Sequence, residues 1–166
     1  MKKLLVIFSC FALVVGCGTG AGSDDSVNPG VTPGAGTKTE TKTASGNPSY
    51  DPDRGQGKFN NDNVKVGETL DAAMAASGDK IYAVKCGSCH KLSDEKLVGP
   101  GWKDVTKRHT AAWIMNFITN TDEMLDKDPK AQAQLEICLV RMPNQNLSDQ
   151  EARDLYEFMR KNDGVK

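Results

Sequence analysis

The stretch that decides the fold is KCGSCHK at residues 85–91, near the middle of a chain of 166 residues. It separates Cys86 from Cys89 by two residues and places His90 directly after the second cysteine. A Cys-x-x-Cys pair serves three chemistries: thiol redox exchange, half of a zinc site or, with a histidine directly after it, covalent attachment of haem. A thiol pair has no use for the histidine, and a zinc site needs a fourth ligand, which only His109 or Cys138 could supply.

The motif suits haem best. On one turn of helix the thiols of Cys86 and Cys89 project the same way, so each can add to a vinyl group along one edge of a porphyrin. His90 then falls under the iron as the proximal ligand. We therefore predict one covalently attached haem c held by these three residues, with zinc binding and thiol redox exchange as the alternatives.

The N-terminus reads as an export signal. Lys2 and Lys3 precede an apolar run from Leu4 to Val15, which is too short to span a bilayer as a permanent helix. The run ends in LVVGC and resembles a bacterial lipoprotein signal, in which residues 1–16 are removed and Cys17 receives lipid. We expect a membrane-anchored protein facing the periplasm, with the choice between inner and outer membrane open. An ordinary cleaved signal with an incidental cysteine is the alternative.

Residues 17–63 read as a tether. The stretch is rich in Gly, Thr, Ser and Pro and nearly free of large apolar side chains, so it cannot bury enough surface to offset its ordering entropy. We predict a flexible coil here and a folded domain over residues 64–166. A domain of about 100 residues gains only marginal stability from its own hydrophobic core, and a covalently held haem would add a large apolar group to that core.

The domain reads as all-α. The clearest helix covers residues 148–162, because Ser148 and Glu151 form a capping box before an apolar face. Residues 69–85 read as largely helical, with a weak point at Ser77–Gly78.

Two further helices are indicated by their caps. Thr110 is placed to cap AAWIMNFITN at residues 111–120. Asp128 is placed to cap another helix that has Pro129 at its first position and runs to about Leu139.

Over residues 64–166 the sequence resembles the class I c-type cytochromes. In that family a first helix leads into the haem motif and packs across the last helix through a glycine and an aromatic residue, and Gly78 and Tyr82 stand at that spacing before Cys86. The last helix of the family supplies a leucine and an aromatic residue three apart, which Leu155 and Phe158 match.

The resemblance also implies which group orients the proximal histidine. The family has Gly-Pro shortly after the histidine, with the proline carbonyl receiving the ring N–H of the proximal ligand, and Gly99–Pro100 occupies that place. The stretch LVGPGWKDVTKRHTAAWI, residues 97–114, is similar to bacterial members that are attached to membranes or encoded with nitrous oxide reductase.

Met142 is the predicted distal ligand. It lies in RMPNQNLS, residues 141–148, a loop stiffened by Pro143, and the family places its ligand methionine in such a Met-Pro loop. His109 is the other candidate, but we expect it near a haem propionate or in solvent. The remaining methionines of the mature chain read as less suitable: Met74, Met115, Met124 and Met159.

His/Met ligation fills both axial positions, so the resemblance implies a one-electron carrier rather than an enzyme, with no separate catalytic residues. A haem-based sensor or a peroxidase-like enzyme with a labile sixth ligand is the alternative. We expect a monomer that binds no nucleic acid. It would take electrons from a quinol-oxidising complex and pass them to nitrous oxide reductase or a terminal oxidase.

Two surface features have more than one interpretation from the sequence. Residues 79–110 carry seven basic and four acidic side chains, which fits either a positive rim that meets an acidic partner or a mixed solvated surface. Cys138 is left over once the other cysteines are assigned. We expect it to be buried between Ile137 and Leu139, with an intermolecular disulfide or a redox-sensitive thiol as the alternatives.

Overall fold

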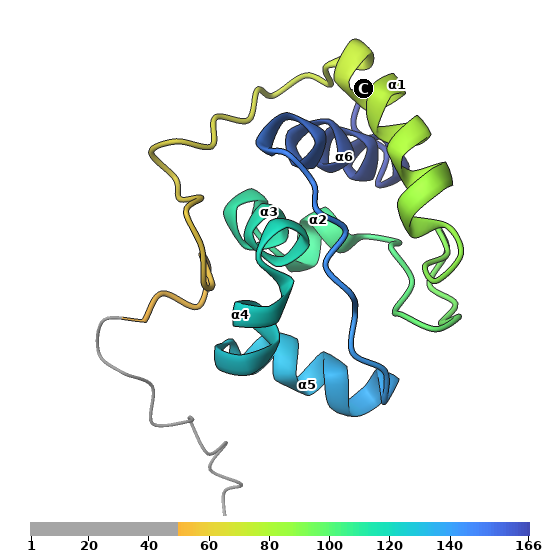
Figure 1. Ribbon diagram of the computed structural model, residues 1–166. Helices are drawn as coiled ribbons and strands as arrows, with labels where there is room; N and C mark the ends of the chain where they lie inside the picture. Colours follow the sequence, from red (N-terminus) through yellow and green to blue (C-terminus); the bar gives the residue numbers. More distant parts are fainter. Residues whose placement is uncertain (1–49) are drawn as a thin grey trace, which may run out of the picture. The chain divides into compact units, whose positions relative to one another are not determined.

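A computed structural model describes residues 50–166 (Figure 1). The predicted signal sequence, Cys17 and the tether up to residue 49 lie outside the described residues. The described part is helical and contains no strand, which confirms the predicted all-α class. None of its helices is long and apolar enough to cross a bilayer. The elements are α1 (Ala72–Ile81), the π-helical turn η1 (Tyr82–Cys86), α2 (Val105–Arg108), α3 (Ala111–Thr119), α4 (Thr121–Lys127), α5 (Pro129–Cys138) and α6 (Asp149–Asn162).

The helices begin where capping side chains satisfy their first N–H groups. The Thr110 hydroxyl accepts from Trp113 N at 3.1 Å, and Asp128 Oδ1 accepts from Ala131 N at 2.8 Å. Ser148 and Glu151 form the predicted capping box. The first helix starts later than the predicted residue 69, because Asp71 caps it by accepting from the N–H groups of Ala73 and Met74.

The crossing of α1 and α6 is the main contact between the two ends of the domain (Figure 1). The helices meet at Gly78, where an added Cβ would lie 2.2 Å from the Asp154 carbonyl oxygen and 2.7 Å from Phe158 Cβ. Leu155 is fully buried beside this point. Gly78 therefore allows a backbone approach that no other residue permits, and α1 continues through it without a break.

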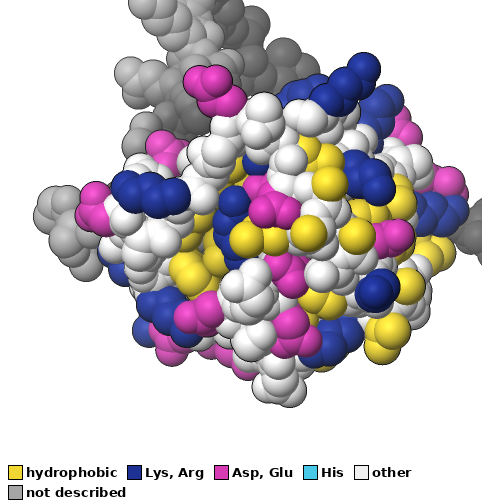
Figure 2. All heavy atoms as spheres, turned by 90° about the horizontal axis from the view of Figure 1, so that it is seen from above, with side chains coloured by type: hydrophobic (Ala, Val, Ile, Leu, Met, Phe, Trp, Pro, Cys, Tyr) yellow, Lys and Arg dark blue, Asp and Glu magenta, His cyan; other side chains and the backbone are white. Residues whose placement is uncertain are grey.

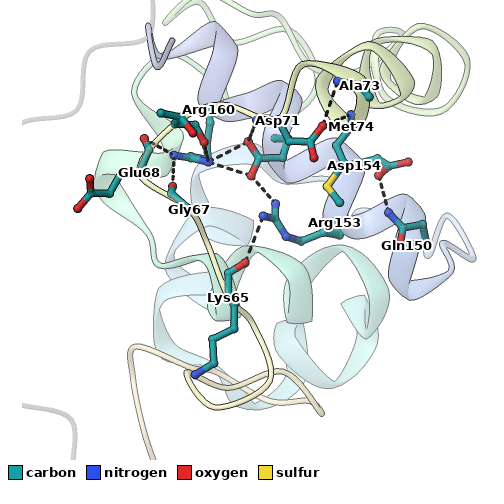
Figure 3. A network of polar contacts seen from close by, with 12 residues as sticks. Lys65, Gly67, Glu68, Asp71, Ala73, Met74, Gln150, Arg153, Asp154 and Arg160 are labelled. Atoms are coloured by element: carbon teal, nitrogen blue, oxygen red, sulfur yellow. Dashed lines mark hydrogen bonds and ion pairs between the residues drawn. The ribbon is translucent and has the colours of Figure 1, made fainter.

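A buried ion pair on α6 faces the segment before α1. Glu157 is 1% exposed, and its carboxylate lies 2.9 Å from Arg160 Nη1. The other guanidinium nitrogen of Arg160 donates to the carbonyls of Gly67 at 2.7 Å and Glu68 at 3.2 Å (Figure 3). Both charges are paired and the carbonyls are satisfied, so the segment before α1 is held against α6.

The packed domain begins earlier than residue 64. Phe59 is 7% exposed, and the fully buried side chain of Asn116 in α3 holds its backbone. The Asn116 oxygen accepts from Phe59 N at 2.9 Å, and its nitrogen donates to Arg54 O at 2.9 Å and Phe59 O at 3.0 Å. Residues 50–63, assigned to the tether from their composition, therefore form a strap along the domain, and the boundary expected at residue 63 is wrong.

The start of the strap is fixed at a second buried group. The Tyr50 hydroxyl and the Trp113 indole N–H both donate to Asp128 Oδ2, the indole at 3.0 Å. Burial and the hydrogen bond to Asp128 raise the pKa of Tyr50, so it remains a donor at neutral pH. Gly55 lies over α3 and α4 at a φ of 71°, where an added Cβ would meet Met124 Sδ at 2.6 Å.

We predict that Asn116→Ala releases the strap. The change removes three hydrogen bonds and leaves buried backbone groups of the strap unpaired, which should lower the free energy of unfolding by about 2–4 kcal/mol. Denaturant unfolding measures the loss, and limited proteolysis should show new cleavage within residues 50–63. The exposed Asn61→Ala is the matched control and should change neither; equal behaviour of the two variants would contradict the role of Asn116.

Candidate haem site

The cysteine motif forms a compact turn at the end of the first helix. In η1 the Gly87 N–H donates to Tyr82 O at 2.8 Å, a spacing of five residues. The N–H groups of Cys89 and His90 then both donate to Cys86 O, at 3.0 and 2.9 Å. These bonds turn the chain at the end of η1 and hold His90 close to Cys86.

The chemistry of the Cys86 thiol argues against redox exchange. Burial raises the pKa of the Cys86 thiol to about 11, which outweighs the opposing effect of Lys85. A reactive cysteine needs the opposite shift, because the thiolate is the nucleophile. Within residues 50–166 no three His, Cys, Asp or Glu side chains gather as metal ligands, which gives zinc binding no support. Both thiols are free, Cys86 buried and Cys89 partly exposed.

His90 is held as a neutral, oriented imidazole. Its side chain is 8% exposed, and Nδ1 lies 2.9 Å from the Pro100 carbonyl oxygen, which requires Nδ1 to carry the proton. Burial lowers the pKa of His90, while the bond to Pro100 acts in the opposite direction. The Nε2 lone pair is then free for a metal ion, and the carbonyl fixes the ring, as hydrogen-bond acceptors behind metal-binding histidines do. The predicted bond to Pro100 is present.

Two hollows adjoin His90. The first, of about 80 Å³, is also lined by Cys89 and Val98, and the second, of about 50 Å³, by Trp102 and Ile114. Five residues line both: His90, Pro100, Phe117, Gln134 and Met142. The structure thus brings Cys89, His90, Pro100 and Met142 to one place, while Cys86 is buried in the core and lines neither hollow.

Met142 comes from the extended connection between α5 and α6 (blue in Figure 1). It is half-buried and lines both hollows, and Pro143 lines the first. Met115 and Met124 are buried in the core and line neither, whereas Met159 lines the second hollow only. Met142 is therefore the one methionine of the described residues that shares both hollows with His90.

His109 lies in the wall of the second hollow and not in solvent. Its ring stacks on Trp113 with centroids 4.0 Å apart, and its Nε2 lies 3.3 Å from the Gln134 side-chain nitrogen. Burial, with the charges of Arg108 and Lys130, lowers the pKa of His109 to about 4. It is neutral at pH 7, and its Nδ1 is buried with no hydrogen-bond partner among the described residues.

Two residues that line the hollows beside His90, Trp102 and Gln134, were not predicted from the sequence. Trp102 is 5% exposed, and its ring centroid lies 5.5 Å from that of His90 and 5.1 Å from that of Tyr82. Its position two residues after Pro100 was the only available signal. Gln134 lines both hollows from α5, and its helical surroundings give no hint of this.

Cys138 differs from its expected environment. Ile137 and Leu139 are 67% and 84% exposed, so the expectation that Cys138 is buried between them is wrong. The helix α5 ends at Cys138, and the half-buried thiol lines the first hollow instead.

Comparison with known proteins agrees with this geometry. The cytochrome c family model matches residues 75–163. A cytochrome c from Rhodothermus marinus is 34% identical, with a TM-score of 0.58 over 60% of this chain and 85% of that chain. An engineered cytochrome c from the same organism, bound to a carbene intermediate, is 33% identical, with a TM-score of 0.55 over 60% of this chain and 86% of that chain. No curated protein matches the chain.

The chain belongs to the cytochrome c family, and its helical fold and Cys-x-x-Cys-His motif are those of a class I c-type cytochrome. Membership implies a covalently attached haem c and haem-based electron transfer. The residues present fit that group: two free thiols, a neutral histidine oriented by a carbonyl, and a largely apolar hollow beside them.

We predict that Gly99→Ala disturbs the ring of His90. An added Cβ at Gly99 would lie 2.3 Å from His90 Cε1, so the ring or the loop must move. The holoprotein should show an altered visible spectrum and a lower melting temperature. Gly67→Ala is the control, because its Cβ would meet nothing closer than Thr69 O at 3.7 Å. An unchanged spectrum and melting temperature in Gly99→Ala would contradict this contact.

Proposed function

We propose that the protein is a one-electron carrier in which His90 and Met142 are the axial ligands of a haem c attached through Cys86 and Cys89. The observation that carries this proposal is the shared position of His90 and Met142 on both hollows. When bound, haem c supplies a ferric–ferrous couple at the iron.

The residues of the chain support this role in three ways. The Pro100 carbonyl fixes the ring of His90, so little reorganisation accompanies a change of charge. A thioether from Met142 favours the ferrous state, because it is a soft ligand. The largely apolar walls act in the same direction, since burial disfavours the additional positive charge of the ferric state.

The residues on both sides of Met142 restrict the loop that carries it. Arg141, the preceding residue, pairs with Asp126 at 2.8 Å and with Asp122 at 3.3 Å, both on α4. Pro143 follows and restricts the backbone. Both features reduce the entropy lost when a weakly binding thioether is held in one place. They favour a closed sixth position over the labile one that a sensor or a peroxidase-like enzyme needs.

We predict that Met142→Ala abolishes the sulfur-to-iron charge-transfer band of the ferric holoprotein. The change should also lower the reduction potential and let the ferrous protein bind carbon monoxide, while haem remains attached after denaturation. Met74→Ala, in α1 and outside both hollows, is the control and should keep the band. Survival of the band in Met142→Ala would remove Met142 as ligand. A wild-type protein that lacks the band and binds carbon monoxide would favour the sensor or enzyme.

We further propose that the carrier is a periplasm-facing lipoprotein anchored through Cys17, where it would connect a quinol-oxidising complex with nitrous oxide reductase or a terminal oxidase. The support for the anchor is the sequence LVVGC after a short apolar run with two lysines before it. The resemblance of residues 97–114 to membrane-attached members is the support for these partners.

We predict that Cys17→Ser abolishes incorporation of a labelled fatty acid and leaves the visible spectrum unchanged, because the anchor is separated from the haem domain by more than 30 residues. Cys10→Ser, inside the apolar run, is the control and should keep the label. Labelling that persists in Cys17→Ser, or disappears in Cys10→Ser alone, would refute lipidation at Cys17.

A further inference from the structure

A third hollow lies between the strap, α3 and α6. Its volume is about 440 Å³, which falls in the range of small-molecule pockets. None of its lining residues lines either hollow beside His90, so it is separate from the haem site. We call it the strap hollow. Its charged lining residues come from the strap, from the chain just after it and from α6: Lys58, Lys65, Asp149 and Arg153.

Positive charge exceeds negative charge in this lining. Lys58, Lys65 and Arg153 are cations, whereas Asp149 is the anion among the lining residues. Lys58 Nζ lies 2.5 Å from Asp149 Oδ1, so these two charges neutralise each other. Lys65 makes no ion pair within residues 50–166, and its amine donates to the Asn61 carbonyl at 3.1 Å. The charge of Lys65 therefore stays uncompensated.

The charge of Arg153 is only partly neutralised. Its Nη1 lies 2.7 Å from Glu157 Oε1, but that carboxylate also pairs with Arg160, so one negative charge faces two guanidinium groups. The contact lacks hydrogen-bond geometry, because Arg153 Nη1 has no hydrogen-bond partner in the described domain. Its Nη2 donates to the Lys65 carbonyl at 3.3 Å (Figure 3). Two positive charges thus remain beside the strap hollow, one on Lys65 and one on the two arginines.

The surface of the domain is otherwise of mixed charge. On the α1 and α6 end of the molecule, Figure 2 shows basic and acidic side chains interspersed. The basic surplus of residues 79–110 does not form an unopposed positive rim either, because three of its lysines pair with acids: Lys91 with Glu95, Lys103 with Asp94 and Lys107 with Asp104. An anion is therefore attracted locally, by the strap hollow, and not by a broad basic face of the kind that binds membranes or nucleic acids.

We propose that the strap hollow binds a phosphate monoester of a small molecule. A phosphate monoester carries about −1.5 to −2 charge units at pH 7, which matches the two uncompensated positive charges, whereas a phosphodiester carries only one. Arginine suits phosphate oxygens because its guanidinium presents several N–H donors in one plane. Phe59, Val64 and Met115 also line the hollow and provide an apolar wall for the organic part of the ester.

The site exists only when the strap is in place. Lys58, Phe59 and Asn63 of the lining belong to the strap, and the Asn116 side chain holds Phe59 through its N–H and its carbonyl. A ligand that binds only the ordered strap stabilises it by mass action. Strap order and ligand affinity are therefore linked, although Asn116 does not line the hollow.

Calorimetric titration with two esters tests the charge match. Full-length holoprotein carrying Cys17→Ser is titrated at pH 8 and low ionic strength with methyl phosphate, a dianion, and with dimethyl phosphate, a monoanion of similar size. We expect methyl phosphate to bind about tenfold more tightly, because each unit of charge on the ligand interacts with the same two cations. Equal binding of the two esters, or no binding of methyl phosphate, would overturn the proposal.

Three single substitutions locate the site. Lys65→Gln should weaken methyl phosphate binding about fivefold, and Asp149→Asn should strengthen it by a similar factor, because one removes a cation and the other an anion. A gain of affinity cannot arise from loss of structure. Lys80→Gln is the matched control, since it removes the same charge from an exposed position of α1 outside the hollow. Equal losses in Lys65→Gln and Lys80→Gln would show a non-specific charge effect and refute the site.

Proteolysis tests the link to the strap. Saturating methyl phosphate should slow cleavage within residues 50–63, dimethyl phosphate at the same concentration should not, and Asn116→Ala should abolish the protection. Protection by phosphatidylglycerol vesicles without protection by methyl phosphate would identify a lipid headgroup as the ligand and refute a soluble phosphate monoester. These measurements do not involve electron transfer, so their failure would refute the strap hollow as a binding site and leave the proposed carrier function standing.

Discussion

The contact between Gly78 and the backbone of α6 is the constraint on which the domain depends. It fixes where α1 crosses α6, and the π-helical turn that continues α1 then determines where Cys86, Cys89 and His90 lie. Tyr82, one turn beyond Gly78, packs its ring against Phe158 with centroids 5.3 Å apart and donates to the His90 carbonyl at 2.7 Å. Helix packing and the position of His90 are thus linked through a single side chain.

The opposite wall of the site has a different origin. It is built by α3, α5 and the connection to α6, which carry Phe117, Gln134 and Met142. Asp128 organises this side: it caps α5, accepts the Trp113 indole and Tyr50 hydroxyl, and is fully buried. Three donors around one carboxylate offset the cost of burying it. The site therefore lies between a wall set by helix packing and a wall set by a buried polar group.

The sequence predicted well those features that depend on local chemistry. The caps at Thr110, Asp128 and Ser148 lie where their side chains imply, because a cap needs only its own first turn. The strap could not be predicted, since residues 50–63 owe their order to Asn116, more than 50 residues further along the chain. Their composition indicated a coil because hydrogen bonds to the backbone hold them, together with a single buried large apolar side chain, that of Phe59. Cys138 was misjudged for a related reason: the hydrophobic residues beside it are exposed, which only the tertiary structure reveals.

The strap also decides how the domain responds to mechanical load. A force applied at Tyr50 is received first by the hydrogen bonds to Asp128 and Asn116, and therefore by α3 and α5, before it reaches α1. The turn that carries Cys86, Cys89 and His90 continues α1, whereas α3 and α5 form the opposite wall of the site. Pulling on Tyr50 would thus load the wall that carries Phe117 and Gln134 before the turn that carries His90.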